Sequence, residues 1–438
     1  MKVAIVGAGV SGLVCAHRLH PRHDVTVFEA GSQLGGHART VEVDLGGGEV
    51  HAVDVGFIVY NEATYPHFTA LLAELGVATQ PSTMSFSVRD ERSGLEYASS
   101  GLRALLAQPS NALRPTFARM LVDVARFNRR ARRLVRAADL TTGDGAFFDD
   151  PGGFDEVTLA DVLADGRWSR HFVDDYLVPL GSSIWSADPS TFLSFPAVAF
   201  ARFMDNHGLL SLGRRPTWRT IGGGSRRYVD AIAAPLGNRV RVGEPVAKVR
   251  RRADARGGVE VVSASRGPER FDRVILAGHS DQMLALLSDP TTREREILGA
   301  LRYQPNVVTL HTDGRLLPTR RAARASWNYH AGIDATTAGG RPAVAVTYWM
   351  NRLQSIRSSR PLLVTLNRQD AIDPARVLAQ HELDHPVFDA GALAAQRRLA
   401  EIQGVDGTYF AGAYWGYGFH EDGVRSALDV CRHFGLVP

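Results

Sequence analysis

The sequence predicts an α/β protein made of two interleaved domains, and three observations support this. Residues Lys2–Val6 form an apolar run of strand length that leads directly into the turn Gly7-Ala8-Gly9-Val10-Ser11-Gly12. A helical pattern then continues to about Leu19, and a second apolar strand ends on Glu29. At 438 residues the chain is longer than one hydrophobic core usually supports, so two domains are expected.

Each part of this opening unit suits the binding of a dinucleotide. Gly7 permits the tight turn, Gly9 lets a pyrophosphate approach the backbone, and Gly12 lets the helix pack against the strand. The helix N-terminus offers N–H groups to phosphates, and Glu29 is placed to accept hydrogen bonds from ribose hydroxyls. An acid there disfavours a 2′-phosphate, so FAD or NAD is expected rather than NADP; the alternative is a chance glycine turn in an ordinary βαβ unit. The predicted contacts are Gly7, Gly9, Ser11, Gly12, Glu29 and Ala30.

The residues after Glu29 resemble the continuation found in FAD-binding oxidoreductases. They read Gln33-Leu34-Gly35-Gly36-His37-Ala38-Arg39-Thr40, similar to the G-G-x-x-x-T segment of the flavin-containing amine oxidase superfamily. That superfamily includes monoamine oxidases, phytoene desaturases and protoporphyrinogen oxidase. The resemblance implies FAD, bound non-covalently, with Gly35 and Gly36 beside its pyrophosphate. His37 stands where many members have Arg, and Arg39 follows two residues later, so either side chain could meet the phosphate; a flexible surface loop is the alternative.

Three further segments carry the same resemblance. Residues 54–61 resemble a D-x-G segment beneath the flavin ring, residues 216–225 the P-x-G-G return to the flavin domain, and residues 408–424 the closing FAD motif. In that motif a helix starting near Glu421 would stabilise negative charge on the reduced flavin. The implied cofactor contacts are Thr40, Gly56, Phe57, Val246, Ala277, Gly412, Gly418, Glu421, Gly423 and Val424.

The resemblance implies a Rossmann-type FAD-binding domain of the glutathione reductase-like/amine oxidase-like kind. An interleaved α+β substrate domain, built on an antiparallel sheet, would complete the fold. Residues 1–79, 216–285 and 401–438 are assigned to the FAD-binding domain, and residues 80–215 and 286–400 to the substrate-binding domain. Strands are expected at 240–242, 245–249, 259–262 and 271–278, which complete one sheet, and at 301–313, 343–349 and 362–366 in the antiparallel sheet.

Composition excludes several classes of protein. With 45% hydrophobic and 22% charged residues and a net charge of +4, the chain is an ordinary globular protein, and no nucleic-acid partner is expected. Cys15 and Cys431 are expected to be buried thiols, because two cysteines give neither a disulfide framework nor metal spacing. No run of 18 apolar residues occurs, and a cytoplasmic location is expected. The helix predicted over 102–138 is rich in arginine at 114–136, where a solvated face or peripheral membrane contact is expected.

Aromatic residues provide the candidates for catalysis and substrate binding. Tyr60, Trp415 and Tyr417 are the catalytic candidates: Tyr60 is expected to project toward the substrate side, and Trp415 and Tyr417 are candidates for the aromatic walls that amine oxidases place before the flavin ring. Residues 168–212 are rich in aromatics and either wall an apolar pocket or form plain core. Substrate contacts are expected at Asn206, His207 and Tyr348. No metal is expected, because no second His or carboxylate stands at ligand spacing from His207.

Residues 54–66, 206–208 and 414–423 most resemble bacterial flavoproteins that accompany cyclopropane fatty-acyl phospholipid synthases, or in plants are fused to them. This implies an FAD-dependent oxidoreductase that removes a hydride from an apolar, fatty-acyl or lipid substrate. An amine oxidase producing peroxide is an alternative, weakened because neither Lys2 nor Lys248 is placed to hold water against the flavin. An FAD-dependent double-bond isomerase and a non-catalytic partner of a lipid methyltransferase also stay open. A single dinucleotide fingerprint leaves oxygen, a quinone or a carrier protein as electron acceptor.

Overall fold

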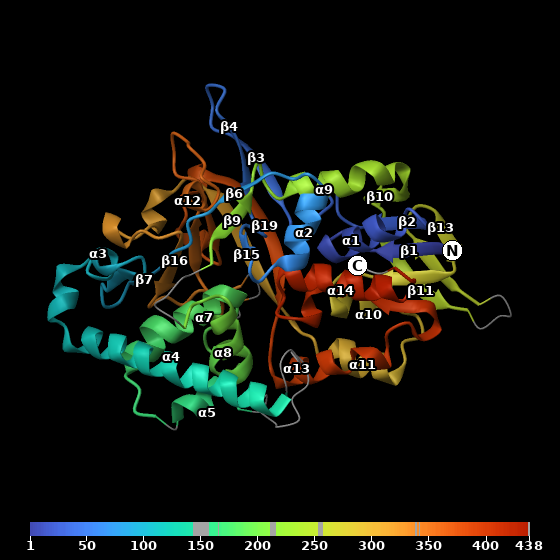
Figure 1. Cartoon of the computed structure of the whole chain (residues 1–438). Coiled ribbons are helices and arrows are strands. Elements are labelled where there is room, and N and C mark those ends of the chain that lie inside the picture. The colour runs from blue at the N-terminus through green and yellow to red at the C-terminus, as the bar shows by residue number, and fades with distance from the viewer. Residues whose placement is uncertain are drawn as a thin grey trace.

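The computed structural model describes residues 1–142, 157–164, 166–210, 216–252, 257–337, 340 and 342–436. Two large sheets organise these residues, one parallel and one mostly antiparallel. Figure 1 shows the parallel sheet with its helices on the right and the second sheet with a layer of helices on the left. Among the described residues, no helix is long and apolar enough to cross a membrane.

The parallel sheet has five strands in the order β10-β2-β1-β14-β20. They are β10 (Val240–Val242), β2 (Asp24–Glu29), β1 (Lys2–Val6), β14 (Arg273–Leu276) and β20 (Thr408–Phe410). The predicted helix α1 (Val10–Leu19) joins β1 to β2. Because side chains alternate along a strand, Val3 and Ile5 enter one core cluster and Ala4 and Val6 another. The sheet is therefore covered on both faces, as parallel sheets generally are.

Helices cover one face of the parallel sheet, and a small antiparallel sheet covers the other. Helices α1, α9 (Arg226–Ala233) and α14 (His420–Arg432) pack on the face that includes Val3 and Ile5. The opposite face carries β11 (Val246–Arg251), β12 (Val259–Ser263), β13 (Gly267–Phe271), α10 (Ser280–Leu286) and α11 (Thr292–Gly299). The expectation of one sheet for the predicted strands between 240 and 278 was wrong. Instead β11, β12 and β13 pair antiparallel with one another, while β10 and β14 join the parallel sheet.

The second sheet has seven strands in the order β19-β15-β18-β17-β16-β7-β8. They are β19 (Val377–Pro386), β15 (Tyr303–His311), β18 (Leu363–Leu366), β17 (Val346–Trp349), β16 (Trp327–Ala331), β7 (Phe86–Asp90) and β8 (Glu96–Ala98). All neighbours are antiparallel except β16 and β7, which come from distant segments and run parallel. The expected antiparallel substrate sheet is thus present, with one parallel pair inside it.

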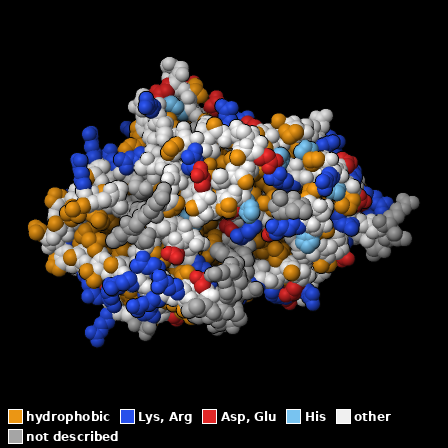
Figure 2. Space-filling view, in the orientation of Figure 1, with side chains coloured by type: hydrophobic (Ala, Val, Ile, Leu, Met, Phe, Trp, Pro, Cys, Tyr) orange, Lys and Arg blue, Asp and Glu red, His pale blue; other side chains and the backbone are white. Residues whose placement is uncertain are grey.

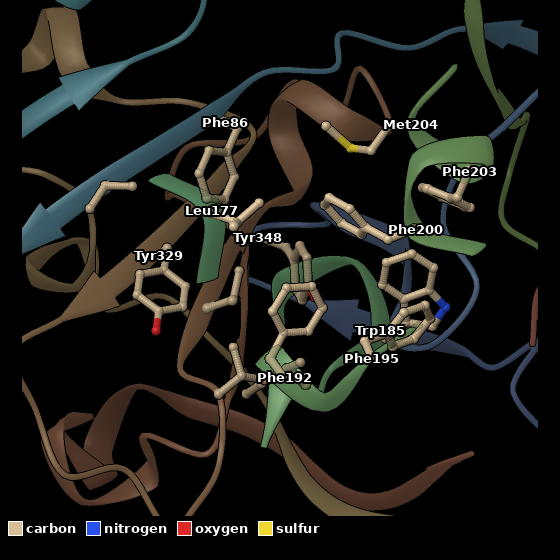
Figure 3. Packing of buried hydrophobic residues seen from close by; sticks show 14 of the residues in the cluster. Phe86, Leu177, Trp185, Phe192, Phe195, Phe200, Phe203, Met204, Tyr329 and Tyr348 are labelled. Carbon is tan, nitrogen blue, oxygen red and sulfur yellow. The ribbon is translucent and has the colours of Figure 1, made fainter. Parts of the chain in front are cut away.

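A layer of helices packs against this sheet and forms an aromatic core. The helices are α4 (Pro115–Thr142), α5 (Leu159–Ala164), α6 (Arg170–Phe172), α7 (Val178–Trp185) and α8 (Ala197–Asn206). Figure 3 shows how Trp185, Phe195 and Phe203 meet in this core; the ring of Trp185 lies 4.7 Å from each of the other two. The continuous helix expected over 102–138 is instead α3 (Leu102–Leu105), a 3₁₀ turn (Pro109–Leu113) and α4. Pro109 and Pro115 start new turns because proline lacks an N–H.

Shorter elements join the two halves. One is a hairpin of β3 (Thr40–Asp44) and β4 (Val50–Asp54). A small sheet combines β5 (Tyr60–Asn61), β9 (Trp218–Ile221) and β6 (Thr79–Pro81). The helices α2 (Pro66–Glu74), α12 (Met350–Leu353) and α13 (Ala390–Arg397) complete the fold. The buried Asp54 carboxylate accepts hydrogen bonds from Thr40 Oγ1 at 2.6 Å, the Ser225 amide at 2.9 Å and Gln354 Nε2 at 3.0 Å. Burial raises the pKa of Asp54 to about 6. This network links three distant segments, including one from the second domain.

The division into domains stays a prediction, and the membership of strands in the two large sheets agrees with it. Every strand of the parallel sheet comes from residues 1–79, 216–285 or 401–438, and every strand of the seven-stranded sheet comes from the remainder. Helices α11 and α13 cross this division. Their residues Ile297, Ala392 and Ala395 pack into the cluster beneath the parallel sheet.

Candidate cofactor and substrate site

A cavity of about 820 Å³ lies between the two sheets. One half is lined by the carboxyl ends of β1, β2 and β14 and by the loops that follow them. The other half is lined by β7, β16 and β17 together with α7 and α8. Ligands of open α/β sheets bind at the carboxyl ends of the strands, so the first half is the expected place for a dinucleotide.

The glycine turn at the start of the cavity leaves the space that a pyrophosphate needs. A β-carbon on Gly9 would have no neighbour within 4 Å, and Gly9 lines the cavity. A β-carbon on Gly12 would lie 1.9 Å from the carbonyl oxygen of Gly7, so only glycine lets α1 approach the strand. Gly7 itself has a φ of +101°. The residues therefore fit the pyrophosphate: Gly9 provides the open cradle, and α1 directs its unpaired N–H groups toward it.

Glu29 is held in place at the far end of this half. Its carboxylate accepts hydrogen bonds from the amides of Ala8 and Gly31, each at 2.8 Å. Ala30 and Val246 line the cavity beside it, as expected for the nucleoside end. The apolar side chains of Met283 and Leu286 complete this end.

The second glycine pair packs directly on the first. Gly35 forms an isolated parallel β-bridge with Gly9. A β-carbon on Gly36 would lie 3.2 Å from the Gly9 α-carbon. Gly56 passes so close to His37 that its β-carbon would lie 2.1 Å from the His37 carbonyl oxygen. Phe57 donates its amide to the same oxygen at 2.8 Å. The two glycine segments and the D-x-G segment therefore form one cradle along the cavity.

Three histidines from distant segments meet beside this cradle. The ring of His37 lies 5.9 Å from that of His279 and 5.3 Å from that of His385. Burial lowers the pKa of His37 to about 4 and that of His385 to about 3, and it also lowers the pKa of His279. Asn306 Nδ2 donates to His385 Nδ1 at 3.1 Å. All three histidines line the cavity whereas Arg39 does not, which favours His37 over Arg39 as the phosphate neighbour.

The helix α14 begins at His420, and its first turn reaches the cavity. The His420 ring stacks on Phe57 with centroids 3.6 Å apart, and its Nε2 lies 3.1 Å from the Tyr228 hydroxyl. Gly412, Gly418 and Phe419 line the same region. The predicted helix N-terminus is therefore at the cavity, through residues 418–420.

Six of the residues predicted to contact the cofactor do not line the cavity: Gly12, Arg39, Thr40, Glu421, Gly423 and Val424. Glu421 instead accepts the amides of His67 and Phe68 at 3.0 and 2.9 Å, which caps the N-terminus of α2. Gly423 allows α14 to approach α1, since its β-carbon would lie 2.7 Å from Val10 Cγ1. Gly12, Glu421 and Gly423 therefore position the helices around the cradle and do not line it.

The three aromatic residues proposed as catalytic walls also lie outside the cavity lining. Tyr60 packs edge-on against Phe68 at 5.4 Å within the core. The Tyr417 hydroxyl donates to the carbonyl oxygen of Ala199 at 3.2 Å, and Trp415 is buried beside Tyr414. Their aromatic character reflects core packing and interdomain contacts, so we assign none of them to the reacting centre.

The substrate half of the cavity contains two of the three residues expected there. His207 and Tyr348 line it, whereas Asn206 is exposed at the end of α8. The Tyr348 ring meets Trp327 edge-on at 5.0 Å, and its side chain is hydrogen-bonded to Ser186. The other side chains that line this half are mainly apolar or carry a hydroxyl group. They include Met84, Ser85, Phe86, Ser99, Leu180, Ser183, Ile184, Phe203, Leu209, Val308 and Leu366.

Fixed charges are scarce along the cavity. Among the described lining residues, the acids are Glu29 and Asp384, both at the cofactor half, and there is no lysine or arginine. Lys248 is exposed on β11, and the Lys2 ammonium lies over the Phe271 ring at 4.6 Å. Neither lysine reaches the cavity, as the sequence predicts.

Comparison with known proteins assigns the chain to a family. The family model for flavin containing amine oxidoreductase matches residues 10–433. The chain belongs to this family. It is an FAD-dependent oxidoreductase, and FAD is the group that the glycine cradle fits.

Solved structures of enzymes share the fold at low sequence identity. A putrescine oxidase with putrescine bound is 17% identical, with a TM-score of 0.69 and 99% of both chains covered. Cyclohexylamine oxidase from Brevibacterium oxydans IH-35A is 19% identical, with a TM-score of 0.69 and the same coverage. A CLA-producing fatty acid isomerase from P. acnes is 14% identical, with a TM-score of 0.68, covering 99% of this chain and 98% of its own.

Sequence reasoning missed His279, Tyr303, Asp384 and His385, which all line the cavity. A signal existed for His279, because it follows a predicted strand that returns to the cofactor. The strand β19, which brings Asp384 and His385, is rich in polar residues and lies at the edge of its sheet. Its pairing with β15 has no signature in the local sequence.

Substitutions of two glycines in the first turn should have different effects, one on FAD affinity and one on stability. We expect Gly9→Ala to fold normally but to lose most FAD affinity, because the added methyl occupies the open cradle. We expect Gly12→Ala to be destabilised by roughly 1–3 kcal/mol or more through overlap with the Gly7 carbonyl. Urea unfolding of the flavin-free variants, followed by FAD titration, measures both effects. Normal FAD affinity in Gly9→Ala would contradict this placement of the pyrophosphate.

Buried histidines predict that the flavin-free protein loses stability in mild acid. As the pH falls below about 6.5, His37 and His385 become protonated in the unfolded chain. In the folded state their lowered pKa values keep both rings neutral, so protonation favours unfolding. At pH 5 the free energy of unfolding is therefore lower by roughly 2 kcal/mol for each of these histidines. Asp54 and Asp422, with pKa values raised to about 6 by burial, act in the opposite sense and offset part of the loss.

Urea unfolding at pH 7 and pH 5 measures this effect. The His385→Asn variant should lose less stability between the two values than the unsubstituted protein, by about 2 kcal/mol. Equal losses in both proteins would show that His385 is already protonated in the folded state.

Proposed function

We propose that this enzyme removes a hydride from an uncharged apolar chain, with the fatty-acyl chain of a lipid as the substrate class. The observation that carries the proposal is the substrate half of the cavity. It is walled by aliphatic, aromatic and hydroxyl side chains, and its described residues include no acid, lysine or arginine. A charged group buried there without a partner would be strongly disfavoured. A methylene chain fits these walls and needs no counter-charge.

The proton that leaves with the hydride needs an acceptor in the same half of the cavity. When bound, FAD supplies the hydride-accepting group, so desaturation leaves one proton to be removed from the neighbouring carbon. His207 Nδ1 donates to the Phe203 carbonyl oxygen at 2.8 Å, which leaves Nε2 as an acceptor. Burial lowers the pKa of His207 to about 4, so the ring is neutral at physiological pH. We infer that His207 takes up this proton.

Aromatic packing holds this imidazole in place. The His207 ring is stacked on the ring of Phe203, with centroids 3.9 Å apart, and lies nearly parallel to the ring of Trp218, with centroids 5.9 Å apart. Thr64 Oγ1 lies 3.4 Å from Nε2. Restricted rotation keeps the acceptor nitrogen at one position, as general-base catalysis requires.

The amine oxidase alternative makes a different demand on this cavity. An alkylammonium ion would find no carboxylate among the described residues of the substrate half. An amine would therefore have to enter as the free base, and its oxidation would accelerate as the pH rises toward the amine pKa. Double-bond isomerisation is compatible with the same apolar walls, because the hydride would return to another carbon of the chain.

An anaerobic spectrum of the flavin-loaded enzyme separates these reactions. We expect dispersed phospholipid to bleach the oxidised flavin band and to yield a new double bond by mass spectrometry, because acyl chains match the uncharged walls. Bleaching by primary amines, with lipid inert, would overturn the proposal in favour of an amine oxidase. An unbleached band with a shifted double bond in recovered lipid would assign isomerisation instead.

Replacement of His207 tests its role as proton acceptor. We expect His207→Gln to slow flavin reduction by about 100- to 10,000-fold, the usual contribution of a general base, with little change in substrate affinity. The wild-type rate should fall as the pH drops through the His207 pKa of about 4, whereas the variant should lack this dependence. Asn206→Ala is the matched control, since that side chain is exposed at the adjacent position. Comparable slowing in both variants would remove His207 from the mechanism.

A further inference from the structure

An exposed apolar group marks one end of the helical layer. Leu113 is 86% exposed, Leu102 is 72% exposed, Val122 is 53% exposed and Leu121 is 38% exposed. Figure 2 shows hydrophobic side chains gathered at the left end of the molecule, where Figure 1 places α3 and the start of α4. Single exposed leucines are ordinary, but a group of them at one end indicates a surface that is covered in use.

Basic charge continues this surface along α4. The outward stripe of the helix is apolar in its first half, at Ala118, Val122 and Ala125. The same stripe continues at helical spacing with three exposed arginines in its second half. They are Arg129, Arg133 and Arg136. Figure 2 shows arginine side chains beside the apolar end.

These three arginines differ from two neighbouring arginines on α4 in their ion pairing. Arg119 and Arg126 are paired with the buried Asp123, at 3.2 and 2.7 Å. Within the described part of the chain, Arg129, Arg133 and Arg136 take part in no ion pair. Among the described residues, no acidic side chain compensates these three charges.

The cavity extends toward this end of the molecule. Its lining includes Ser99, which lies three residues before Leu102. Met84 and Phe86, on and beside the neighbouring strand β7, also line it. The substrate half of the cavity therefore includes a residue that lies three positions from Leu102 of the exposed apolar group.

We propose that this surface docks on an anionic lipid bilayer. We name it the docking surface, made of Leu102, Leu113, Leu121, Val122, Arg129, Arg133 and Arg136. Its leucines and valine enter the headgroup boundary, and its three arginines lie against lipid phosphates. An apolar segment continued by unpaired arginines on one helix stripe is the pattern of interfacial helices, and it complements an anionic lipid surface. The docking itself needs no catalysis; where the proposed function holds, it also places the acyl half of the cavity toward its substrate.

Flotation with lipid vesicles tests the docking surface. The FAD-loaded full-length enzyme should bind vesicles of phosphatidylcholine with added phosphatidylglycerol, and added salt should weaken this binding. The triple variant Arg129→Glu, Arg133→Glu, Arg136→Glu should bind about 100-fold or more weakly, since each basic residue near the surface contributes about 1 kcal/mol. Leu113→Glu with Val122→Glu should also release the enzyme, because both side chains would carry charge into the boundary.

Matched controls distinguish this surface from general attraction. The triple variant Arg22→Glu, Arg295→Glu, Arg357→Glu makes the same charge change at exposed positions elsewhere and should retain binding. Val50→Glu, at a side chain that is 50% exposed on the β3–β4 hairpin, should also retain it. An intact flavin spectrum verifies that each variant is folded.

Three outcomes would overturn the proposal. They are absence of binding to anionic vesicles, equal losses in the two arginine triples, and a dimer in sedimentation that Leu113→Glu dissociates while vesicles stay unbound. The last outcome would show that a second copy of the chain covers the surface. Because vesicle binding is measured without turnover, its failure is distinguishable from failure of the proposed reaction.

Discussion

The close approach of α1 to the end of β1 is the contact on which the cofactor half of the structure depends. The missing side chain of Gly12 lets the helix begin against the carbonyl of Gly7, and the missing side chain of Gly423 then lets α14 pack on the start of α1. Residues far apart in the sequence therefore meet at one edge of the parallel sheet. Both helix N-termini lie at the cavity, where their dipoles favour the negative charge of a nucleotide cofactor.

The described residues that line the two halves of the cavity share the absence of lysine and arginine. Burial keeps His37 and its neighbours His279 and His385 neutral by lowering the pKa of each ring. Among the described lining residues there is no lysine or arginine, so recognition of the pyrophosphate rests on backbone N–H groups, helix dipoles and imidazoles. An anion beside these rings would favour their protonated forms.

The cofactor half could be predicted from the sequence because its signals are local. A strand, a glycine turn and a helix ending at Leu19 follow one another, and each glycine has a steric reason. The other contacts depend on long-range pairing: His385 reaches the cavity only because β19 pairs with β15. Residue type misled at Tyr60 and Tyr417, since an aromatic side chain suits a wall or a core equally well. Only the packing of Tyr60 on Phe68 and of the Tyr417 hydroxyl on Ala199 decides between them.

The arginines of α4 show how structure divides one sequence feature into two physical roles. Arg119 and Arg126 neutralise the buried Asp123 and so belong to the fold, because an unpaired carboxylate there would be costly. Arg129, Arg133 and Arg136 lie on the outward stripe, where their positive charge contributes nothing to the core. The chain thus keeps strong charge at one surface, whereas the described residues of the substrate half of the cavity include no acid, lysine or arginine. This separation supports both proposals, because the apolar tail of a lipid suits the substrate half and its anionic head suits the arginines.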